Sequence, residues 1–476
     1  MNKLIFIIPI VFSTLIIGIL DLGEGSGLSE NIVDNIIISY SDTLAKTCVD
    51  CHADLLAEET VHQPAKKDCE RCHILSGEEH PIKNKHTFNL ADKVPDLCYE
   101  CHESKSDMDL VHTPVKEGKC LDCHFIHSSP NLYLVKVEPV SGLCLTCHKL
   151  DVSSAKMVHQ PFADGSCTKC HNPHQSESKS FLQMDQPRLC TQCHRDHRAI
   201  AKLENVHPPY KNDCLSCHRP HSSTEEHLSD LKLQDLCFSC HSEFKAAITS
   251  LPVVHQAIYE EKTCLNCHTP HASNEAHILS AKENDVCISC HDKTLMAAGG
   301  SMIRNIKELL SDGNTIHGAI KDNGCTVCHQ PHGSERHFLL AGQFPETEYI
   351  QGIAENFELC FRCHNKKLFD EPQTITNTNF RNGEKNLHYT HIYGTKGRNC
   401  TLCHNVHGSA GKHLIEEKTT FGNWEMPIRF KSLEHGGSCA PGCHEERKYE
   451  RLPLADSIQQ KITTVEEAPE SLKPSN

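Results

Sequence analysis

Apolar residues occur in short groups along most of this chain, and one long apolar run stands apart from that pattern. Residues 4–20 are mostly apolar, follow the short basic start Met1-Asn2-Lys3 and end before Asp21. A basic start followed by such a run predicts an export signal, although its length is also at the lower edge for crossing a bilayer. We therefore expect residues 1–27 to be a signal peptide or an N-terminal membrane anchor, and the chain to be exported.

The rest of the pattern predicts few regular elements. Isoleucine and leucine recur at helical spacing in residues 302–311, which predicts a helix packed against its surroundings. Residues 366–399 are polar, with many Asn and Thr, and are typical of a loop. Residues 450–476 are rich in Glu, Lys, Pro and Ser and predict a disordered tail.

Cysteine and histidine follow a much stricter pattern. Fourteen C-x-x-C-H motifs and one C-x-x-x-C-H motif use all 30 cysteines. If each motif is one helical turn, its two thiols and its histidine project from one face. The cysteine pairs are Cys48 and Cys51, Cys69 and Cys72, Cys98 and Cys101, Cys120 and Cys123, Cys144 and Cys147, Cys167 and Cys170, Cys190 and Cys193, Cys214 and Cys217, Cys237 and Cys240, Cys264 and Cys267, Cys287 and Cys290, Cys325 and Cys328, Cys360 and Cys363, Cys400 and Cys403, and Cys439 and Cys443. The motif histidines are His52, His73, His102, His124, His148, His171, His194, His218, His241, His268, His291, His329, His364, His404 and His444.

Three chemistries use paired cysteines: structural zinc, disulfides and covalent haem. Zinc sites do not need a histidine after every second cysteine, and disulfides need none. A histidine in that position in all fifteen motifs therefore favours haem c, attached through two thioethers and ligated by the motif histidine. We expect about fifteen haems. The last motif needs a bulge at Pro441 and Gly442 to present both thiols, so haem attachment there is left open.

The motifs are arranged in repeats. After a lone motif at Cys48, seven doubled repeats each begin with an entry histidine and contain a first and a second motif. Between Cys120 and Cys264 the spacing is 24 residues per motif, room for one short helix and a loop. Such repeats cannot bury their own faces and stack instead. We expect a mostly irregular fold with short α-helices and very little β-structure, forming an elongated array whose core is the haems. Residues 45–300 would hold regular repeats with haems 1–11, and residues 301–449 elaborated repeats with haems 12–15.

A second set of histidines is in phase with the motifs and supplies candidates for the other axial position of each iron. Seven are the entry histidines, six are trailing histidines that stand three residues after a first-motif histidine, and two stand alone. The candidates are His62, His112, His159, His207, His255, His317 and His391; His127, His174, His221, His271, His332 and His407; and His80 and His435. Methionine, the other common distal ligand, shows no such phase. Two imidazoles on every iron predict low-spin haems of low potential. Seven histidines are left for structural or surface roles: His86, His197, His227, His277, His337, His388 and His413.

Composition supports a core made by cofactors. Only 38% of residues are hydrophobic even with the cysteines included, and there is one tryptophan. This supply is poor for 476 residues, so we expect the haem-free chain to be largely unfolded. The net charge of −15 argues against nucleic acid as a partner.

The V-H-x-P, C-x-x-C-H-x-P-H and L-C-x-x-C-H elements resemble those of bacterial multihaem c-type cytochromes with doubled C-x-x-C-H repeats, and the resemblance covers residues 48–444. It implies an electron-transfer wire in anaerobic or extracellular respiration, similar in kind to periplasmic and outer-membrane conduits. Donor and acceptor redox proteins, and an outer-membrane porin, would be its partners; self-assembly is left open. The periplasm, the outer membrane or the cell exterior would be its location. The alternative is a multihaem enzyme of the nitrite or hydroxylamine type with one open haem. Such enzymes often have lysine in place of a motif histidine, and no C-x-x-C-K occurs here. We therefore expect no catalytic residues.

Overall fold

A computed structural model describes residues 47–451 except 78, 84 and 298. The predicted signal or anchor and residues 452–476 of the predicted tail lie outside this range, whereas Glu450, which the prediction assigned to the tail, ends a strand. The chain is divided into two compact units, one comprising the chain up to Cys101 together with Cys120–Lys136, the other comprising His102–Lys119 together with the chain from Val137. The boundaries predicted at residues 300 and 301 stay predictions.

Helices are short throughout the described residues, as expected from the 24-residue spacing. The longest, α8 and α9, have eight residues each. The α-helices are α1 (Cys48–Cys51), α2 (Asp96–Tyr99), α3 (Thr113–Lys116), α4 (Cys120–Cys123), α5 (Val140–Cys144), α6 (Gln160–Ala163), α7 (His197–Ile200), α8 (Leu233–Cys240), α9 (Ser242–Thr249), α10 (Glu283–Ile288), α11 (Ile306–Leu309), α12 (Gly318–Asn323), α13 (Glu358–Phe361) and α14 (Leu387–Ile392). Single 3₁₀ turns form several of the motifs, including Cys69–Arg71, Cys167–Lys169, Cys190–Gln192, Cys214–Ser216 and Cys400–Leu402. No described helix is long and apolar enough to cross a membrane.

Strands are more frequent than the sequence predicted, at 18% of residues, and form no closed sheet in the described chain. Six antiparallel ladders of two residues per strand repeat one arrangement: the strand ending before an entry histidine pairs with the strand after the trailing histidine of the next repeat. These ladders are β1 (Thr60–Val61) with β5 (Ser128–Ser129), β4 (Leu110–Val111) with β7 (Gln175–Ser176), β6 (Met157–Val158) with β9 (Ser222–Ser223), β8 (Asn205–Val206) with β11 (Ala272–Ser273), β10 (Val253–Val254) with β15 (Gly333–Ser334), and β14 (Thr315–Ile316) with β20 (Gly408–Ser409). Successive repeats are therefore joined by backbone hydrogen bonds.

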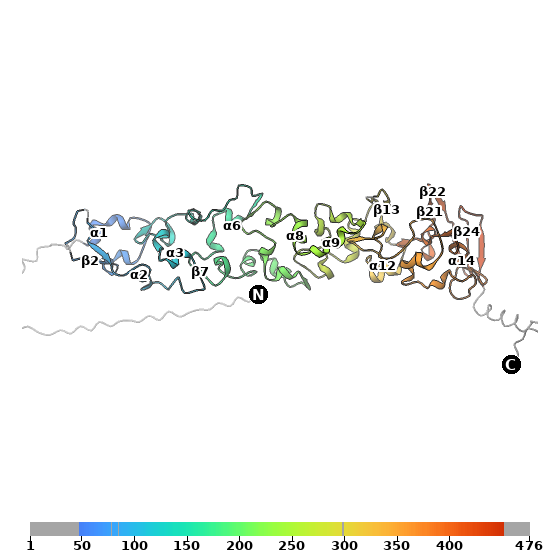
Figure 1. Cartoon of the computed structure of the whole chain (residues 1–476), viewed down its shortest axis with the longest axis horizontal. Coiled ribbons are helices and arrows are strands. Elements are labelled where there is room, and N and C mark those ends of the chain that lie inside the picture. The colour runs from blue at the N-terminus through green and yellow to red at the C-terminus, as the bar shows by residue number, and fades with distance from the viewer. Residues whose placement is uncertain (1–46, 78, 84, 298, 452–476) are drawn as a thin grey trace, which may run out of the picture. The chain divides into compact units, whose positions relative to one another are not determined.

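The remaining strands belong mainly to the first repeat and to the inserted segments. They are β2 (His73–Leu75) with β3 (Phe88–Leu90), β12 (Leu295–Met296) with β13 (Met302–Ile303), β16 (Tyr349–Ile350) with β19 (Gly397–Arg398), β17 (Arg381–Asn382) with β18 (Lys385–Asn386), β21 (Lys418–Phe421) with β22 (Trp424–Pro427), and the three-stranded sheet β23 (Lys431–Leu433), β24 (Gly436–Cys439) and β25 (Arg447–Glu450). Figure 1 shows β21, β22, β24 and α14 gathered in the C-terminal part of the chain.

Two expectations about the insertions need correction. The helix predicted for residues 302–311 exists only as α11, because Met302 and Ile303 instead pair with Met296 and Leu295 in a hairpin. The loop predicted for residues 366–399 contains strands and the helix α14. Asn386 begins that helix by accepting a hydrogen bond from the backbone N–H of Tyr389, at 3.2 Å. Asn386 is fully buried and its amide donates to Leu368 and Glu371 carbonyls, which fixes the start of α14.

Buried apolar side chains are few, as the composition predicted. The hydrophobic cluster comprises Phe357, Phe369 and Ile392, with Cys400 packed against it, and it lies in the C-terminal insertions. In the regular repeats many large apolar side chains are exposed instead, among them Leu121 and Phe125 beside a motif. The regular repeats thus expose apolar surface near the motif cysteines, where a large apolar group would cover it.

Candidate functional site

Most motifs form one tight turn that presents both thiols and the histidine on one side. In a typical case the backbone N–H of His124 donates to the carbonyl of Cys120 at 3.0 Å, and His218 and His404 repeat this with Cys214 and Cys400. The structure joins none of the thirty cysteines, all of them in the described residues, in a disulfide. The last motif differs, because Cys439 ends β24 and residues 440–446 connect it to β25. A side chain added at Gly442 would meet the Trp424 ring at 1.8 Å, so this bulge requires glycine.

Eleven motif histidines, all in the described residues, each face another imidazole at a nearly constant separation. Their ring centres lie 5.9 to 6.3 Å apart, with the ring planes 9° to 41° from parallel. The pairs are His52 with His80, His73 with His127, His148 with His112, His171 with His221, His194 with His159, His218 with His271, His241 with His207, His268 with His332, His291 with His255, His329 with His407, and His364 with His317. All eleven partners belong to the set predicted from the sequence as second ligands.

The separation fits two imidazoles on opposite sides of one metal. A metal–imidazole bond of about 2 Å, with the ring centre about 1 Å beyond the bonded nitrogen, places the two centres about 6 Å apart. Ring contact alone spreads centre separations over about 4.5 to 7 Å. The narrow range observed in eleven pairs therefore favours a common axial geometry.

The pairs follow one rule. A second-motif histidine faces the entry histidine of its own repeat, as His148 faces His112. A first-motif histidine faces the trailing histidine of the next repeat, as His171 faces His221. The lone motif obeys the same rule, because His52 faces His80, which belongs to the repeat that follows. A doubled repeat is therefore incomplete without its successor.

Hydrogen bonds orient one member of most of these pairs. The Nδ1 of an entry histidine donates to the carbonyl just before the next trailing histidine: His112 to Pro173 at 2.9 Å and His255 to Pro331 at 2.9 Å. The Nδ1 of a first-motif histidine donates to the carbonyl nine residues later: His218 to His227 at 2.9 Å. Since a carbonyl only accepts, Nδ1 carries the proton and Nε2 is left as the coordinating atom. Such second hydrogen bonds fix ring orientation at metal sites and raise ligand basicity.

A recurring loop supplies the carbonyl that holds each of these first-motif histidines. Its residues nine and ten positions after that histidine have positive φ near 55°, which is unusual for non-glycine residues. A buried serine five positions after the histidine donates to the far side of the loop; Ser334, for instance, bonds the Leu340 carbonyl at 2.6 Å. The serines are Ser129, Ser176, Ser223, Ser273, Ser334 and Ser409. Sequence reasoning missed them, although their constant phase with the motifs was visible.

Burial keeps many of these imidazoles neutral, the form that binds metal. Desolvation, followed by the neighbouring His197 and His218, lowers the pKa of His271 to about 4. Desolvation and then His329 lower the pKa of His407 to about 4. The pKa of His332 and of His255 is lowered as well, in both cases chiefly by burial.

Thiols of consecutive motifs adjoin one another. At the boundary between repeats the first cysteines interact with each other, as Cys190 does with Cys214 and Cys237 with Cys264. Within a repeat the second cysteines lie close enough to interact electrostatically, as Cys170 does with Cys193. Groups attached to consecutive motifs would therefore be neighbours.

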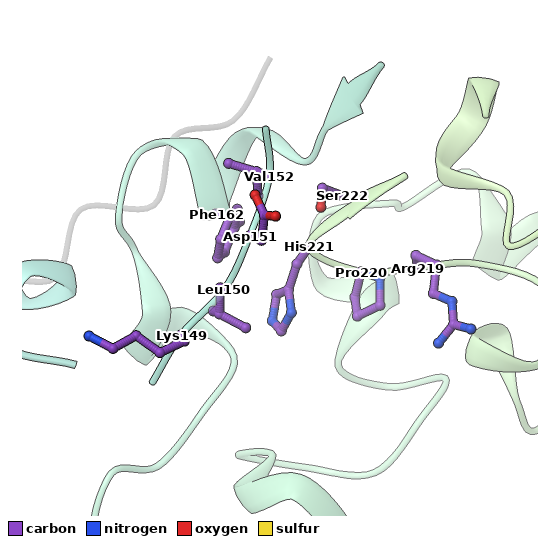
Figure 2. Close-up of a pocket in the computed structure, with 9 residues that line it drawn as sticks. All are labelled: Lys149, Leu150, Asp151, Val152, Phe162, Arg219, Pro220, His221 and Ser222. Carbon is purple, nitrogen blue, oxygen red and sulfur yellow. The ribbon is translucent and has the colours of Figure 1, made fainter. Parts of the chain in front are cut away.

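A cavity of about 280 Å³ lies beside one imidazole pair (Figure 2). It is lined by residues 149–152, Phe162 and residues 219–222, which include the trailing histidine His221. Apolar Leu150, Val152 and Phe162 line it together with the cations Lys149 and Arg219 and the carboxylate of Asp151. Apolar walls beside basic groups suit a flat apolar cofactor that carries carboxylates, so these residues fit haem.

The repeat that begins at His391 departs from the rule, because its two motif histidines form no imidazole pair of this kind within the described residues. His404 donates from Nδ1 to the His413 carbonyl at 2.9 Å, and His444 donates to the Glu445 carbonyl at 2.6 Å. His391, a predicted ligand, interacts electrostatically with His444. His435 is more than half exposed and lies 3.8 Å from the Glu434 carboxylate. His388, which the sequence left in a structural or surface role, is half-buried, and desolvation followed by His404 lowers its pKa to about 4.

Four other predicted site histidines are not among the eleven imidazole pairs described above. His62 donates from Nδ1 to the Ile126 carbonyl at 3.0 Å, as the entry histidines of later repeats do. The backbone N–H of His174 bonds the Asn172 side chain at 3.1 Å. His102 and His124 are the remaining motif histidines, and His124 has the usual Nδ1 bond, to Tyr133 at 2.9 Å. The roles predicted for these four histidines stay predictions.

Comparison with protein families identifies the repeats. A model described as the doubled CXXCH motif matches residues 62–107, 112–152, 159–199, 207–246, 255–296 and 317–369. Each match begins at an entry histidine, and together they cover more than half of the chain. Six doubled motifs imply about 12 haem c sites. A comparison with curated proteins finds no match.

Proposed function

The chain belongs to the doubled CXXCH motif family and is a multihaem c-type cytochrome; from this premise we propose that it is an electron-transfer wire rather than an enzyme. Bound haem supplies the one-electron chemistry, and the protein sets the separation, orientation and potential of the sites. The wire would carry fifteen haems, one at each of the fourteen C-x-x-C-H motifs and one at Cys439 and Cys443.

The imidazole pairs are the observation that carries this proposal. A histidine on each side of an iron leaves no position for a substrate, and two nitrogen ligands keep the iron low-spin and of low potential. The eleven pairs with separations of 5.9 to 6.3 Å support such closure along most of the chain. A nitrite- or hydroxylamine-converting cytochrome would need one iron with an open position.

The linkage between repeats supports a continuous path. Each first-motif iron would take its second ligand from the following repeat, and the ladder beside it fixes the two repeats together. The adjoining thiols of consecutive motifs support short distances between consecutive haems. These features favour an elongated array in which charge passes from site to site.

The proposal includes location and partners. Haem c attachment and the apolar N-terminal run are consistent with an exported protein in the periplasm, at the outer membrane or outside the cell. Other redox proteins would then be the donor and the acceptor, with an outer-membrane porin as a further partner of a conduit.

Mass and spin state test the proposal together. We expect the mass of the purified chain to correspond to fifteen haems, with all ferric irons low-spin by electron paramagnetic resonance. Adding nitrite or hydroxylamine with a reductant should give no catalytic turnover. Several high-spin irons per chain, or sustained turnover of either compound, would rule out the wire in favour of the enzyme.

A further inference from the structure

We infer that His388 is the second axial ligand of the iron bound at Cys400, Cys403 and His404, so that α14 supplies a ligand that in other repeats comes from the following repeat. This inference rests on the proposed function. It changes the role predicted for His388 and removes His435 from the ligand set.

The pairing rule leaves one iron without a partner. In every repeat where the structure shows the pair, a first-motif histidine faces a histidine from the following repeat, as His329 faces His407. His404 is the first-motif histidine of the repeat that begins at His391, and the described residues place no trailing histidine of a following repeat opposite it. Its iron therefore needs a ligand from another source.

The helix α14 is packed beside the Cys400 motif. Its last residue, Ile392, belongs to the buried cluster against which Cys400 packs. A side chain added at Gly397 would lie 1.8 Å from the Ile392 carbonyl oxygen, so the chain passes directly against the end of α14 three residues before Cys400. This close approach fixes the helix relative to the motif.

His388 has the hydrogen bonding of a histidine prepared for a metal. Its Nδ1 lies 2.9 Å from the Thr378 hydroxyl, which leaves Nε2 as the coordinating nitrogen. The Phe380 ring packs edge-on against the imidazole, with ring centres 5.1 Å apart. Two histidines act electrostatically on His388, and His404 does so more strongly than His391.

The same helix serves the other motif of the last repeat. His391 stands one turn after His388, and its Nδ1 donates to the Leu387 carbonyl at 2.7 Å, which leaves its Nε2 available. His444 acts electrostatically on His391. This agrees with the pairing rule, in which a second-motif histidine faces the entry histidine of its own repeat. The helix α14 thus supplies two ligands. In other repeats such ligands are entry and trailing histidines, which stand next to the two strands of a ladder.

Spin state tests the assignment. In the holoprotein, His388→Ala should convert one iron per chain from low-spin to high-spin, and added imidazole should restore the low-spin signal. His388→Met should keep that iron low-spin and raise its potential, because thioether sulfur replaces nitrogen. The methionine variant keeps a ligand on this iron, so it also shows whether α14 still folds.

Matched controls decide the outcome. His435→Ala, which removes the exposed histidine predicted from the sequence, should leave every iron low-spin, and haem counts should match the wild type in all variants. An unchanged low-spin spectrum in His388→Ala, or a high-spin iron in His435→Ala, would overturn the assignment. Several high-spin irons in the wild type would instead overturn the proposed function, so the two failures are distinguishable.

Discussion

At the scale of single residues, backbone groups do much of the work of orienting the metal ligands. The sequence left His227, His277 and His413 without a function, and the structure shows that their carbonyls hold His218, His268 and His404. Tyr133, Ser180 and Phe338 occupy the same position in other repeats, so the imidazoles of that series are not required. What recurs is a left-handed conformation, which costs about 1–3 kcal/mol per non-glycine residue and persists only where the surroundings enforce it.

The buried serines hold the residues of this loop in the left-handed conformation, and Ser334→Ala tests that role. Ser334 is fully buried, donates to the Leu340 carbonyl and accepts from the Arg336 N–H at 3.0 Å. Its loss should lower the free energy of unfolding by about 1–3 kcal/mol and shift the potential of the iron bound through His329. Denaturant unfolding and redox titration measure both effects. Ser250→Ala, at an exposed helix end, should change neither; equal effects of the two substitutions would contradict the role of the loop.

At the scale of elements, the two-residue ladder is the unit that joins repeats. Strands this short are not stable alone. Each ladder nevertheless places an entry histidine next to a trailing histidine. The backbone N–H of His317, for example, donates to the His407 carbonyl at 3.1 Å. These two histidines face different motif histidines, His364 and His329. Disturbing one ladder should therefore affect two irons.

Gly408→Ala should disturb the ladder between β14 and β20 in this way. The added methyl group would lie 2.2 Å from the Leu309 carbonyl oxygen, a backbone atom that cannot move freely. We expect a loss of about 1–3 kcal/mol of stability and altered resonance signals from two irons per chain. Gly318→Ala is the control, since nothing lies within 4 Å of its added carbon. A Gly408→Ala protein with wild-type stability and spectra would contradict the role of the ladder.

At the scale of the whole molecule, the chain lacks the apolar interior that usually stabilises a protein of 476 residues. Its few fully buried large side chains include Phe357 and Phe369, both in the C-terminal insertions. In the regular repeats, the buried residues of the ladders are small or polar, as at Ser129, Gln175 and Ala272. Burial of haem surface is the remaining large source of stabilisation for these repeats.

The haem-free chain should accordingly be largely unfolded. Chain entropy costs about 1–2 kcal/mol per ordered residue, and the apolar burial available to the regular repeats cannot offset it. Circular dichroism of chain produced without haem attachment should show little regular structure and no cooperative melting. The holoprotein under the same conditions is the control, and native-like cooperative melting of the haem-free chain would contradict this expectation.

The sequence by itself determined the chemistry of this protein: the fifteen motifs, the doubled repeats and fourteen of the histidines that we propose as second ligands. It could do so because thioether attachment and axial ligation demand particular residues at fixed spacing, and such spacing is local. The tertiary structure decided which histidine faces which motif, since each ladder joins segments about 60 to 90 residues apart. It also revealed α14 within a segment whose polar composition predicted a loop, because the helix depends on the buried Asn386 and on the cluster around Ile392. The assignment of His388 in place of His435 as a ligand follows from that packing, which cannot be read from the spacing of residues along the chain.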